Sequence, residues 1–191
     1  MRRERADAAR NREAVLAAAA RLFAERGDPE RVSMDDIAAA AGVGKGTLFR
    51  RFGDRTGLIR ALIEQRTEEL RTAVAEGPPP LGPGAPARER VLALLDALLT
   101  FKLDHRPLTL ALENAGVGSP YRNETYSVLH TQLAALLTEA RKPLSDDADF
   151  LAHAMLAAVR ADLVDHLSGN GMPEERMRAG LAALCDAVIE A

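Results

Sequence analysis

The 191-residue sequence has little of what several protein classes need. Its single cysteine, Cys185, cannot form an internal disulfide, so nothing points to an oxidising compartment. The longest apolar runs are only a few residues, far below the roughly 20 that a bilayer-spanning helix requires. Residues 1–5 are mostly charged and no apolar stretch follows them, so no signal peptide is visible. We therefore expect a cytoplasmic protein without a membrane partner.

Recognisable catalytic and metal-binding patterns are also missing. No two histidines stand four apart, as in a helical zinc site, and Cys185 has no clustered partner. Residues 42–46 read Gly-x-Gly-x-Gly, which is not the dinucleotide-binding fingerprint, and no strand precedes them. The paired acids Asp146 and Asp147 stand at a predicted helix start, where capping explains them. We expect no enzyme activity, no metal ion and no cofactor.

Charge is unevenly distributed along the chain. The 25 basic residues are nearly balanced by 28 acidic ones, for a net charge of −3. Residues 1–60 nevertheless carry 13 basic and 9 acidic residues, a net of +4, which leaves −7 for the remainder. This asymmetry favours an anion-binding N-terminal segment on an acidic body, although a coding bias toward arginine would give the same count.

Apolar residues recur at spacings of three and four almost throughout, which predicts an all-α fold. Asp7 is predicted to cap a first helix that ends at Gly27, and Ser33 a second that ends at Gly42. Further helices are predicted over residues 45–51, 54–76, 88–104, 107–114, 120–142, 146–168 and 173–189. Eight of the eleven residues from 77 to 87 are proline or glycine, so this stretch is predicted to be an irregular surface connection; a proline-rich ligand segment is the alternative.

Residues 33–55 have the spacing of a helix-turn-helix. Two short predicted helices are joined at Gly42-Val43-Gly44, with Ala38 four residues before the first glycine and Leu48 six residues after it. Glycine supplies the positive φ of the turn, a small residue lets the helices approach, and Val43 and Leu48 anchor the second helix to the core. Short helix pairs with a glycine turn are common, so this spacing alone is not specific.

The full stretch from Ile37 to Leu58 is more specific, and it reads IAAAAGVGKGTLFRRFGDRTGL. It resembles the DNA-binding signature of TetR-type transcriptional regulators, which typically has Ile-Ala, then Ala-Gly-Val, then Gly-Thr-Leu-Tyr, then Phe, then Lys followed by Leu. Phe49 replaces the usual tyrosine, so any phosphate contact through that hydroxyl is lost. Arg55 replaces the usual lysine and keeps its charge. The resemblance covers residues 10–60, and beyond them only the helical layout matches.

The resemblance implies a fold and a function. A three-helix DNA-binding domain over residues 1–53 would join an effector-binding and dimerisation domain over residues 54–191, through a connecting helix at 54–76 and a loop at 77–87. The chain would act as a homodimeric one-component regulator, a repressor, in the cytoplasm of a bacterium and associated with its nucleoid. It would bind an inverted-repeat operator in double-stranded DNA and be released by an unknown small-molecule effector. Two alternatives are a helical interaction module without operator binding and an α-helical enzyme.

The same resemblance implies that the helix at 45–51 enters the major groove. Lys45 and Arg50 suit base edges or adjacent phosphates, because guanine O6 and N7 accept from such cations. The predicted DNA-binding residues are Ser33, Gly44, Lys45, Gly46, Thr47, Phe49, Arg50, Arg51 and Arg55. For Arg50 and Arg51 the alternative is a solvated face. Arginines 2, 3 and 5 would form either a minor-groove arm or a disordered solvated tail.

The second half of the chain is predicted to contain a small-molecule site. Residues 91–160 are mostly apolar with interspersed polar groups, which is typical of a small-molecule pocket. The predicted ligand-binding residues are Phe101, His105, Glu113, Asn114, Tyr121, Arg122, Tyr126, His130 and His153. The two histidines His130 and His153 could equally be satisfied core residues.

The last two predicted helices carry apolar seams. The predicted dimer interface consists of Leu156, Leu163, Leu167, Met177, Leu181, Leu184 and Val188, packed in a four-helix arrangement with a second copy. The alternative is a monomer whose last two helices lie inside its own core. Cys185 is expected to be a small buried residue rather than a redox sensor.

Overall fold

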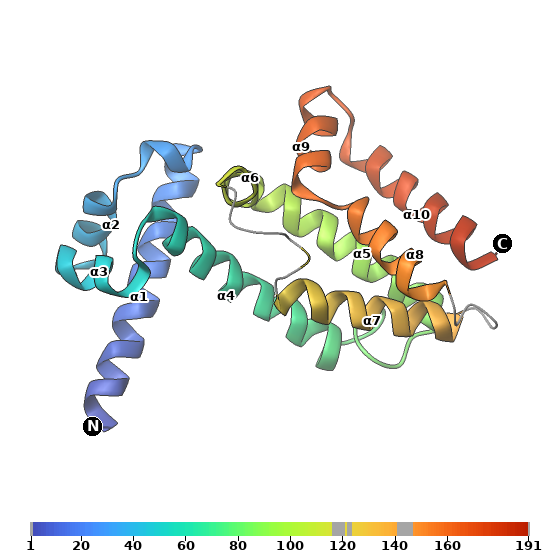
Figure 1. Ribbon diagram of the computed structural model, residues 1–191, viewed down its shortest axis with the longest axis horizontal. Coiled ribbons are helices and arrows are strands. Elements are labelled where there is room, and N and C mark those ends of the chain that lie inside the picture. Colours follow the sequence, from blue (N-terminus) through green and yellow to red (C-terminus); the bar gives the residue numbers. More distant parts are fainter. Residues whose placement is uncertain (1, 116–120, 122–123, 141–146, 191) are drawn as a thin grey trace. The chain divides into compact units, whose positions relative to one another are not determined.

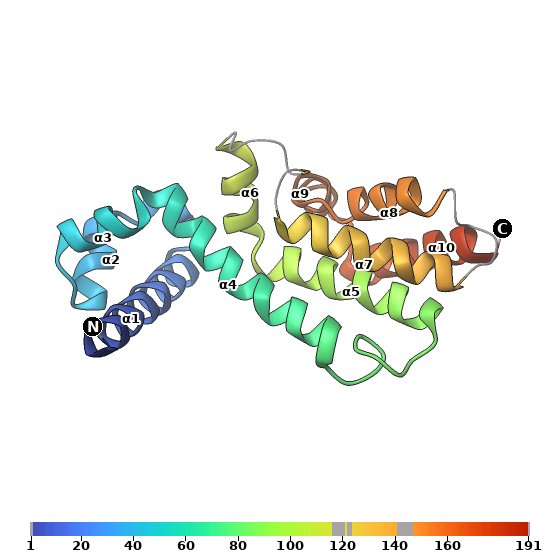
Figure 2. The same ribbon diagram turned by 60° about the horizontal axis from the view of Figure 1, so that its bottom comes forward.

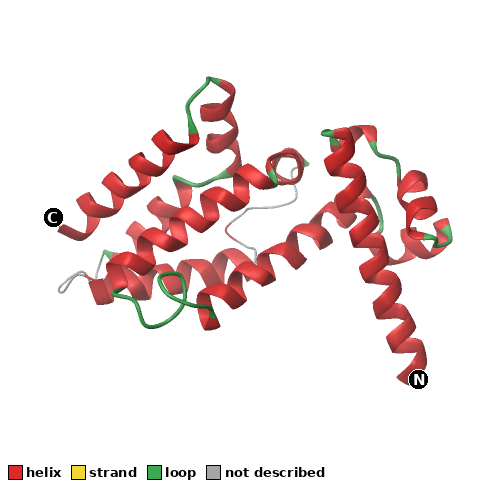
Figure 3. Ribbon diagram, turned by 180° about the vertical axis from the view of Figure 1, so that it is seen from behind, coloured by secondary structure: helices red, strands yellow, loops and turns green. Residues whose placement is uncertain are grey.

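The computed structural model describes residues 2–115, 121, 124–140 and 147–190. Over these residues the regular structure is helical, as Figure 3 shows, and this confirms the predicted all-α fold. No helix among the described residues is both long enough and apolar enough to span a bilayer. The chain divides into two compact units, Met1–Arg66 and Thr67–Ala191, and the division falls within one long helix.

The first unit contains α1 (Arg2–Arg26), the 3₁₀ turn η1 (Pro29–Arg31), α2 (Met34–Ala41), α3 (Lys45–Phe52) and the beginning of α4 (Arg55–Glu76) (Figure 1). Helix α1 packs against α2, and α2 against α3. Its core is made by apolar side chains from every helix, among them Leu16, Phe23, Ile37, Leu48 and Leu58. This core holds α3 by one face only.

The start of α1 corrects a prediction. Asp7 does not begin the helix, because the helix already starts at Arg2 and the Asp7 carboxylate instead pairs with Arg10 one turn later. The backbone at positions 2, 3 and 5 is therefore helical, and contact of these arginines with a minor groove stays a prediction. Neither proline nor glycine interrupts this stretch, so the helix continues to its N-terminal end.

The second unit contains the end of α4, then α5 (Ala87–Asp104), α6 (Arg106–Asn114), α7 (Glu124–Ala140), α8 (Ala148–Ala157), α9 (Ala161–Gly169) and α10 (Glu174–Glu190). Helix α5 packs against both α7 and α10, α7 packs against α8, and α6 packs against α9 (Figure 2). Leu94, Leu95, Leu133, Leu137 and Met155 are fully buried at the centre of this arrangement. Residues 77–86 form turns, as their proline and glycine content predicts.

The single helix predicted over residues 146–168 is wrong, because the structure divides it into α8 and α9. Arg160 has an extended backbone (φ −67°, ψ 148°) and forms the N-cap of α9. The Glu113 carboxylate, on α6, accepts hydrogen bonds from the backbone N–H groups of Ala161 (3.3 Å) and Asp162 (3.1 Å). A helix start needs acceptors for its first N–H groups, and here a distant side chain supplies them. The helical period of the sequence cannot reveal such a partner.

Most residues of the predicted dimer seam pack at least partly within the chain itself. Met177, Leu181 and Leu156 are buried within the chain's own core. Leu167, Leu184 and Val188 pack partly against that core, and of the seven predicted residues Leu163 is exposed.

The seam turns inward because α10 is bound to α5 by polar contacts as well as by packing. Arg178 contacts both Asp96 and Thr100, and Arg88 pairs with Asp186.

Candidate nucleic-acid interface

The turn between α2 and α3 is built by local side-chain and backbone chemistry. Ser33 and Asp36 form a capping box at the start of α2: the Ser33 hydroxyl accepts from the Asp36 N–H (3.1 Å), and the Asp36 carboxylate accepts from the Ser33 N–H (3.2 Å). These hydrogen bonds, together with nearby Arg26, lower the pKa of Asp36. Gly42 ends α2 with φ 66°, in the left-handed region that favours glycine. The helix-turn-helix spacing predicted from the sequence is therefore confirmed.

Helix α3 has one buried face and one exposed face. Leu48 and Phe52 are buried in the core of the first unit, which fixes the rotation of the helix about its axis. The exposed residues are Lys45, Gly46, Thr47, Phe49, Arg50 and Arg51. The helix contains no acidic residue, and Phe49 is a large apolar side chain that is 39 % exposed. A positively charged surface with an exposed aromatic ring is therefore presented to solvent.

Two glycines at the start of α3 have no internal explanation. Gly44 is the N-cap with an ordinary φ of −69°, and Gly46 lies within the first helical turn. A Cβ added at Gly46 meets no atom within 4 Å, and one added at Gly44 would only approach the Thr47 hydroxyl at 3.9 Å. By contrast, a Cβ at Gly57 would lie 2.0 Å from the Phe52 carbonyl oxygen. Packing therefore requires glycine at 57 but not at 44 or 46.

The basic residues that are predicted to contact DNA form two groups. Some are exposed, and others are bonded to residues of the first unit. Arg50 is exposed, and no residue in the described ranges pairs with it. Lys45 pairs with Asp35 at 2.8 Å, but both side chains are more than 60 % exposed. Arg51 instead donates to the Ala8 carbonyl oxygen on α1 (2.6 Å), and Arg55 binds both the side chain and the carbonyl oxygen of Glu30. Arg51 and Arg55 therefore also hold elements of the first unit together.

The junction between α3 and α4 is fixed by a side-chain cap and a glycine. The Asp54 carboxylate accepts from the Gly57 N–H at 2.7 Å and so caps α4, and Gly53 precedes it with φ 75°. This sharp connection orients α3 relative to the first turns of α4 within the same unit.

In the second unit, four of the predicted ligand-binding residues form a contiguous cluster. Tyr121 and Tyr126 meet edge to face with ring centroids 5.2 Å apart, and the His130 and His153 rings stack at 3.9 Å. The Tyr126 hydroxyl lies 2.5 Å from Nδ1 of His153, and burial raises the pKa of Tyr126. We refer to these four residues as the aromatic cluster.

The other predicted ligand residues are placed differently. Phe101 and His105 stack on each other at the end of α5, where the His105 Nδ1 lies 3.0 Å from the Phe101 carbonyl oxygen. Glu113 caps α9. Arg122 and the side chain of Asn114 lie outside the described residues.

Sequence reasoning missed a charged group near Glu113. Arg160 lies 3.7 Å from Glu113 and 2.9 Å from Asp162, and these partners help to raise the pKa of Arg160. Burial lowers the pKa of Lys102, with the charge of Glu113 opposing that effect. The sequence around Lys102 gives no signal of this charged group, because the other members come from α6 and from the start of α9.

Comparison with known proteins supports this description. A family model for "Bacterial regulatory proteins, tetR family" matches residues 15–62. An HTH-type transcriptional regulator of Staphylococcus aureus (strain MRSA252) is 34 % identical over 110 residues, which is 57 % of each protein. The HTH-type transcriptional repressor LfrR of Mycolicibacterium smegmatis is 39 % identical over 83 residues, 44 % of this chain and 42 % of that protein. The chain thus spans about half the length of these curated relatives.

Solved structures match over nearly the whole chain. A crystal structure assigned to the TetR family, from Rhodococcus sp., aligns with a TM-score of 0.68 and 25 % identity over 95 % of this chain and 99 % of that one. A TetR-like transcriptional regulator from Rhodococcus sp. RHA1 aligns with a TM-score of 0.60 and 27 % identity, over 92 % and 93 % of the two chains.

Proposed function

Because residues 15–62 match the model of the tetR family of bacterial regulatory proteins, we propose that the chain is a dimeric one-component repressor of transcription of that family. In this proposal α3 enters the major groove of an inverted-repeat operator, and a small-molecule effector releases it. One observation carries the proposal: α3 presents exposed basic residues and two glycines that neither its turn geometry nor its packing requires.

The start of α3 suits close approach to a duplex. No side chain caps its first N–H groups, and such groups with the helix dipole attract phosphate oxygens. The absence of Cβ atoms at Gly44 and Gly46 lets a phosphate or base edge approach the backbone itself. The Ser33 hydroxyl accepts a hydrogen bond in the capping box, and its own hydrogen remains to donate to a second phosphate.

Base recognition is assigned to the exposed face. Arg50 has the planar donor pair that binds guanine O6 and N7, and it is not engaged by a described residue. Lys45 would exchange its exposed contact with Asp35 for a base edge or phosphate, at little cost because both groups are solvated. Thr47 and Phe49 can contact thymine methyl groups. Arg51 and Arg55 are assigned to positioning α3 and α4, while their charge still attracts phosphates.

The proposed dimer uses the outward face of α10. Ala179, Gly180, Ala183 and Ala187 are exposed on that helix, opposite to the side that packs on α5, and a Cβ added at Gly180 meets nothing within 4 Å. Small residues let two helices approach closely, so this face suits the same face of a second copy. A dimer would place two α3 helices on half-sites one DNA turn apart, about 34–36 Å.

The second unit is proposed to hold the effector. The aromatic cluster and the charged group around Arg160 supply polar contacts beside an apolar core, which is the usual composition of a ligand site. An effector releases DNA only through different affinity for the DNA-bound and free conformers. Helix α4 contributes residues to both units, and we propose that it transmits the difference.

A gel-shift titration of the purified full chain on its own upstream intergenic DNA tests this function. We expect a specific complex that weakens steeply as salt rises, because phosphate contacts release counterions. An unrelated duplex of the same length is the control. Equal affinity for both duplexes, or no complex at low salt, would contradict operator binding and favour the helical interaction module. A thermal-shift screen followed by release from the operator then identifies effectors.

A further inference from the structure

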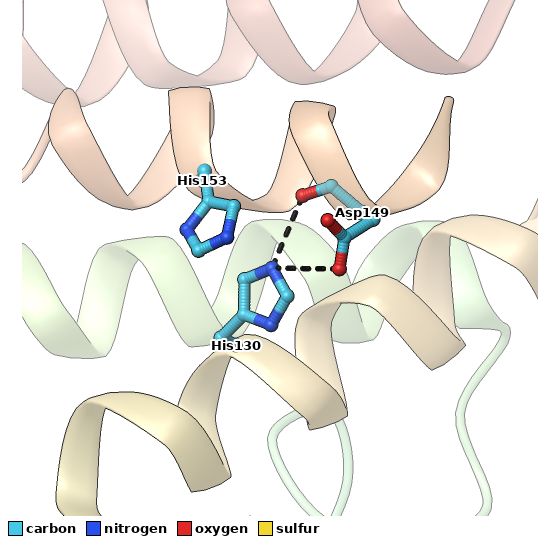
Figure 4. Close-up of side chains that lie close together, drawn as sticks. All are labelled: His130, Asp149 and His153. Atoms are coloured by element: carbon cyan, nitrogen blue, oxygen red, sulfur yellow. Dashed lines mark hydrogen bonds and ion pairs between the residues drawn. The ribbon is translucent and has the colours of Figure 1, made fainter. Parts of the chain in front are cut away.

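Three metal-ligating side chains from two helices meet in the second unit. His130 lies on α7, and Asp149 and His153 lie one turn apart on α8. One ligand atom from each residue can be chosen such that all three lie within 4.8 Å of one another. Figure 4 shows the two side chains of α8 and the imidazole of α7 directed toward one another. DNA recognition and the small-residue face of α10 do not use these residues, whereas His130 and His153 also belong to the aromatic cluster of the proposed effector site.

We propose that His130, Asp149 and His153 bind a divalent transition-metal ion of the zinc type. Two imidazole nitrogens and one carboxylate oxygen form a donor set that suits Zn²⁺ and is unlike the all-oxygen sets that hold Mg²⁺ or Ca²⁺. Three protein ligands leave one coordination position for water or another small ligand. The site is a property of the second unit and does not depend on DNA binding.

The distance between His130 and Asp149 supports this assignment. Nε2 of His130 lies 3.5 Å from an Asp149 carboxylate oxygen, which is too long for a good hydrogen bond. Ligand atoms at about 2.0–2.2 Å from a tetrahedral zinc ion are separated by roughly 3.3–3.6 Å, which includes the observed spacing. Nε2 of His130 also lies 3.1 Å from the Asp149 carbonyl oxygen, to which it donates a proton in the metal-free state. Metal binding therefore replaces that hydrogen bond and moves the ring proton to Nδ1 or to solvent.

His153 is oriented by a neighbouring phenol. Its Nδ1 lies 2.5 Å from the Tyr126 hydroxyl, so with Nδ1–H donating to that oxygen the lone pair of Nε2 is presented for a metal. Metal-binding histidines generally donate their other ring N–H in this way. The His130 and His153 rings stack at an interplanar angle of 26°, so both imidazoles lie beside the Asp149 carboxylate in one small cluster.

The burial of the three ligands fits an ion that enters from solvent. The Asp149 side chain is 79 % exposed, whereas that of His130 is 13 % exposed. A hydrated cation can thus first meet the carboxylate and then exchange water for the imidazoles behind it. Because the ligands come from both α7 and α8, a bound ion would join these two helices and stabilise the second unit against unfolding.

Zinc titration of the tag-free full chain, with a chromophoric chelator as competitor, tests the site. We expect one Zn²⁺ per chain, a rise in Tm on binding, and no such rise with Mg²⁺. His153→Gln and Asp149→Asn should each weaken Zn²⁺ binding, His153→Gln by at least about 100-fold. His166→Gln, which removes an exposed histidine on α9, is the matched control and should bind Zn²⁺ as the unaltered chain does.

A second measurement covers the case in which a variant fails to fold. Co²⁺ added to the unaltered chain should give intense visible absorption bands of a four- or five-coordinate site, and His130→Gln should abolish them. Circular dichroism of each metal-free variant establishes its fold. Zn²⁺ affinity that is unchanged in both His153→Gln and Asp149→Asn, or a weak octahedral Co²⁺ spectrum, would overturn the proposal.

Discussion

Helices α3 and α10 each bury one apolar face, and their exposed faces differ in kind. The exposed face of α3 carries Lys45, Phe49 and Arg50, whereas that of α10 carries alanine and glycine at positions such as 180 and 183. The first surface suits a polyanion with apolar methyl groups in its groove, and the second suits a closely packed helix. The buried faces account for the fold, and the exposed faces distinguish the two proposed partners, DNA and a second copy.

The largest expected effect comes from the exposed face of α10. Ala183→Arg should separate the dimer, because an arginine side chain cannot fit between closely packed helices. Loss of the second half-site contact should lower operator affinity by about 100-fold or more. Sedimentation velocity and operator titration measure the two effects. Ala135→Arg, at an exposed alanine of α7, is the control and should leave both unchanged. A dimeric Ala183→Arg variant would refute the assigned interface.

The second-largest expected effect tests whether Arg50 on α3 contacts a base edge. Arg50→Ala should lower operator affinity by about 10–100-fold, in line with the loss of one bidentate base contact of roughly 1–3 kcal/mol. Affinity for an unrelated duplex should change much less, because phosphate contacts remain. Arg21→Ala removes an exposed arginine from α1 and should have little effect on either duplex. Equal losses on both duplexes would mean that Arg50 contacts phosphate rather than a base edge.

A third variant tests the second unit without touching either exposed face. Glu113→Ala removes the side-chain cap of α9 and should lower the free energy of unfolding by about 1–2 kcal/mol. Urea unfolding followed by circular dichroism measures it, with Glu139→Ala at an exposed position of α7 as the control. Equal free energies of unfolding for Glu113→Ala and Glu139→Ala would contradict the capping role.

The smallest expected effect concerns a departure from the family pattern. Phe49→Tyr restores a hydroxyl on the exposed face of α3 and should tighten DNA binding by a few-fold, about 0.5–1 kcal/mol for one hydrogen bond. The gain should be similar on the operator and on an unrelated duplex, because a phosphate carries no sequence information. A gain confined to the operator would instead place the hydroxyl at a base edge.

The first unit was predictable because its signals are local. The Ser33 capping box, the positive φ of Gly42 and the Asp54 cap each connect residues only a few positions apart. Short-range rules of capping and turn chemistry therefore place α2 and α3 correctly. The internal bonds of Arg51 and Arg55 were not predictable, because their partners Ala8 and Glu30 are distant in sequence.

The second unit was less predictable because its decisive contacts are long-range. The break between α8 and α9 depends on Glu113 from α6, and the inward rotation of α10 depends on packing against α5. Apolar periodicity gave the seam of α10 correctly but could not say whether the same chain or a second copy covers it. The histidine and aspartate ligands likewise meet only through the packing of α7 against α8.

The central claim is that the exposed start of α3 is shaped for DNA rather than for the chain's own packing. Gly46→Ala tests it most directly when stability and operator affinity are measured on the same preparation. Alanine has open space there and a higher helix propensity, so the free energy of unfolding should stay constant or rise by up to about 1 kcal/mol. Operator affinity should fall about tenfold, because the new methyl group holds the duplex away from the backbone. Unchanged operator affinity in this stable variant would contradict the account.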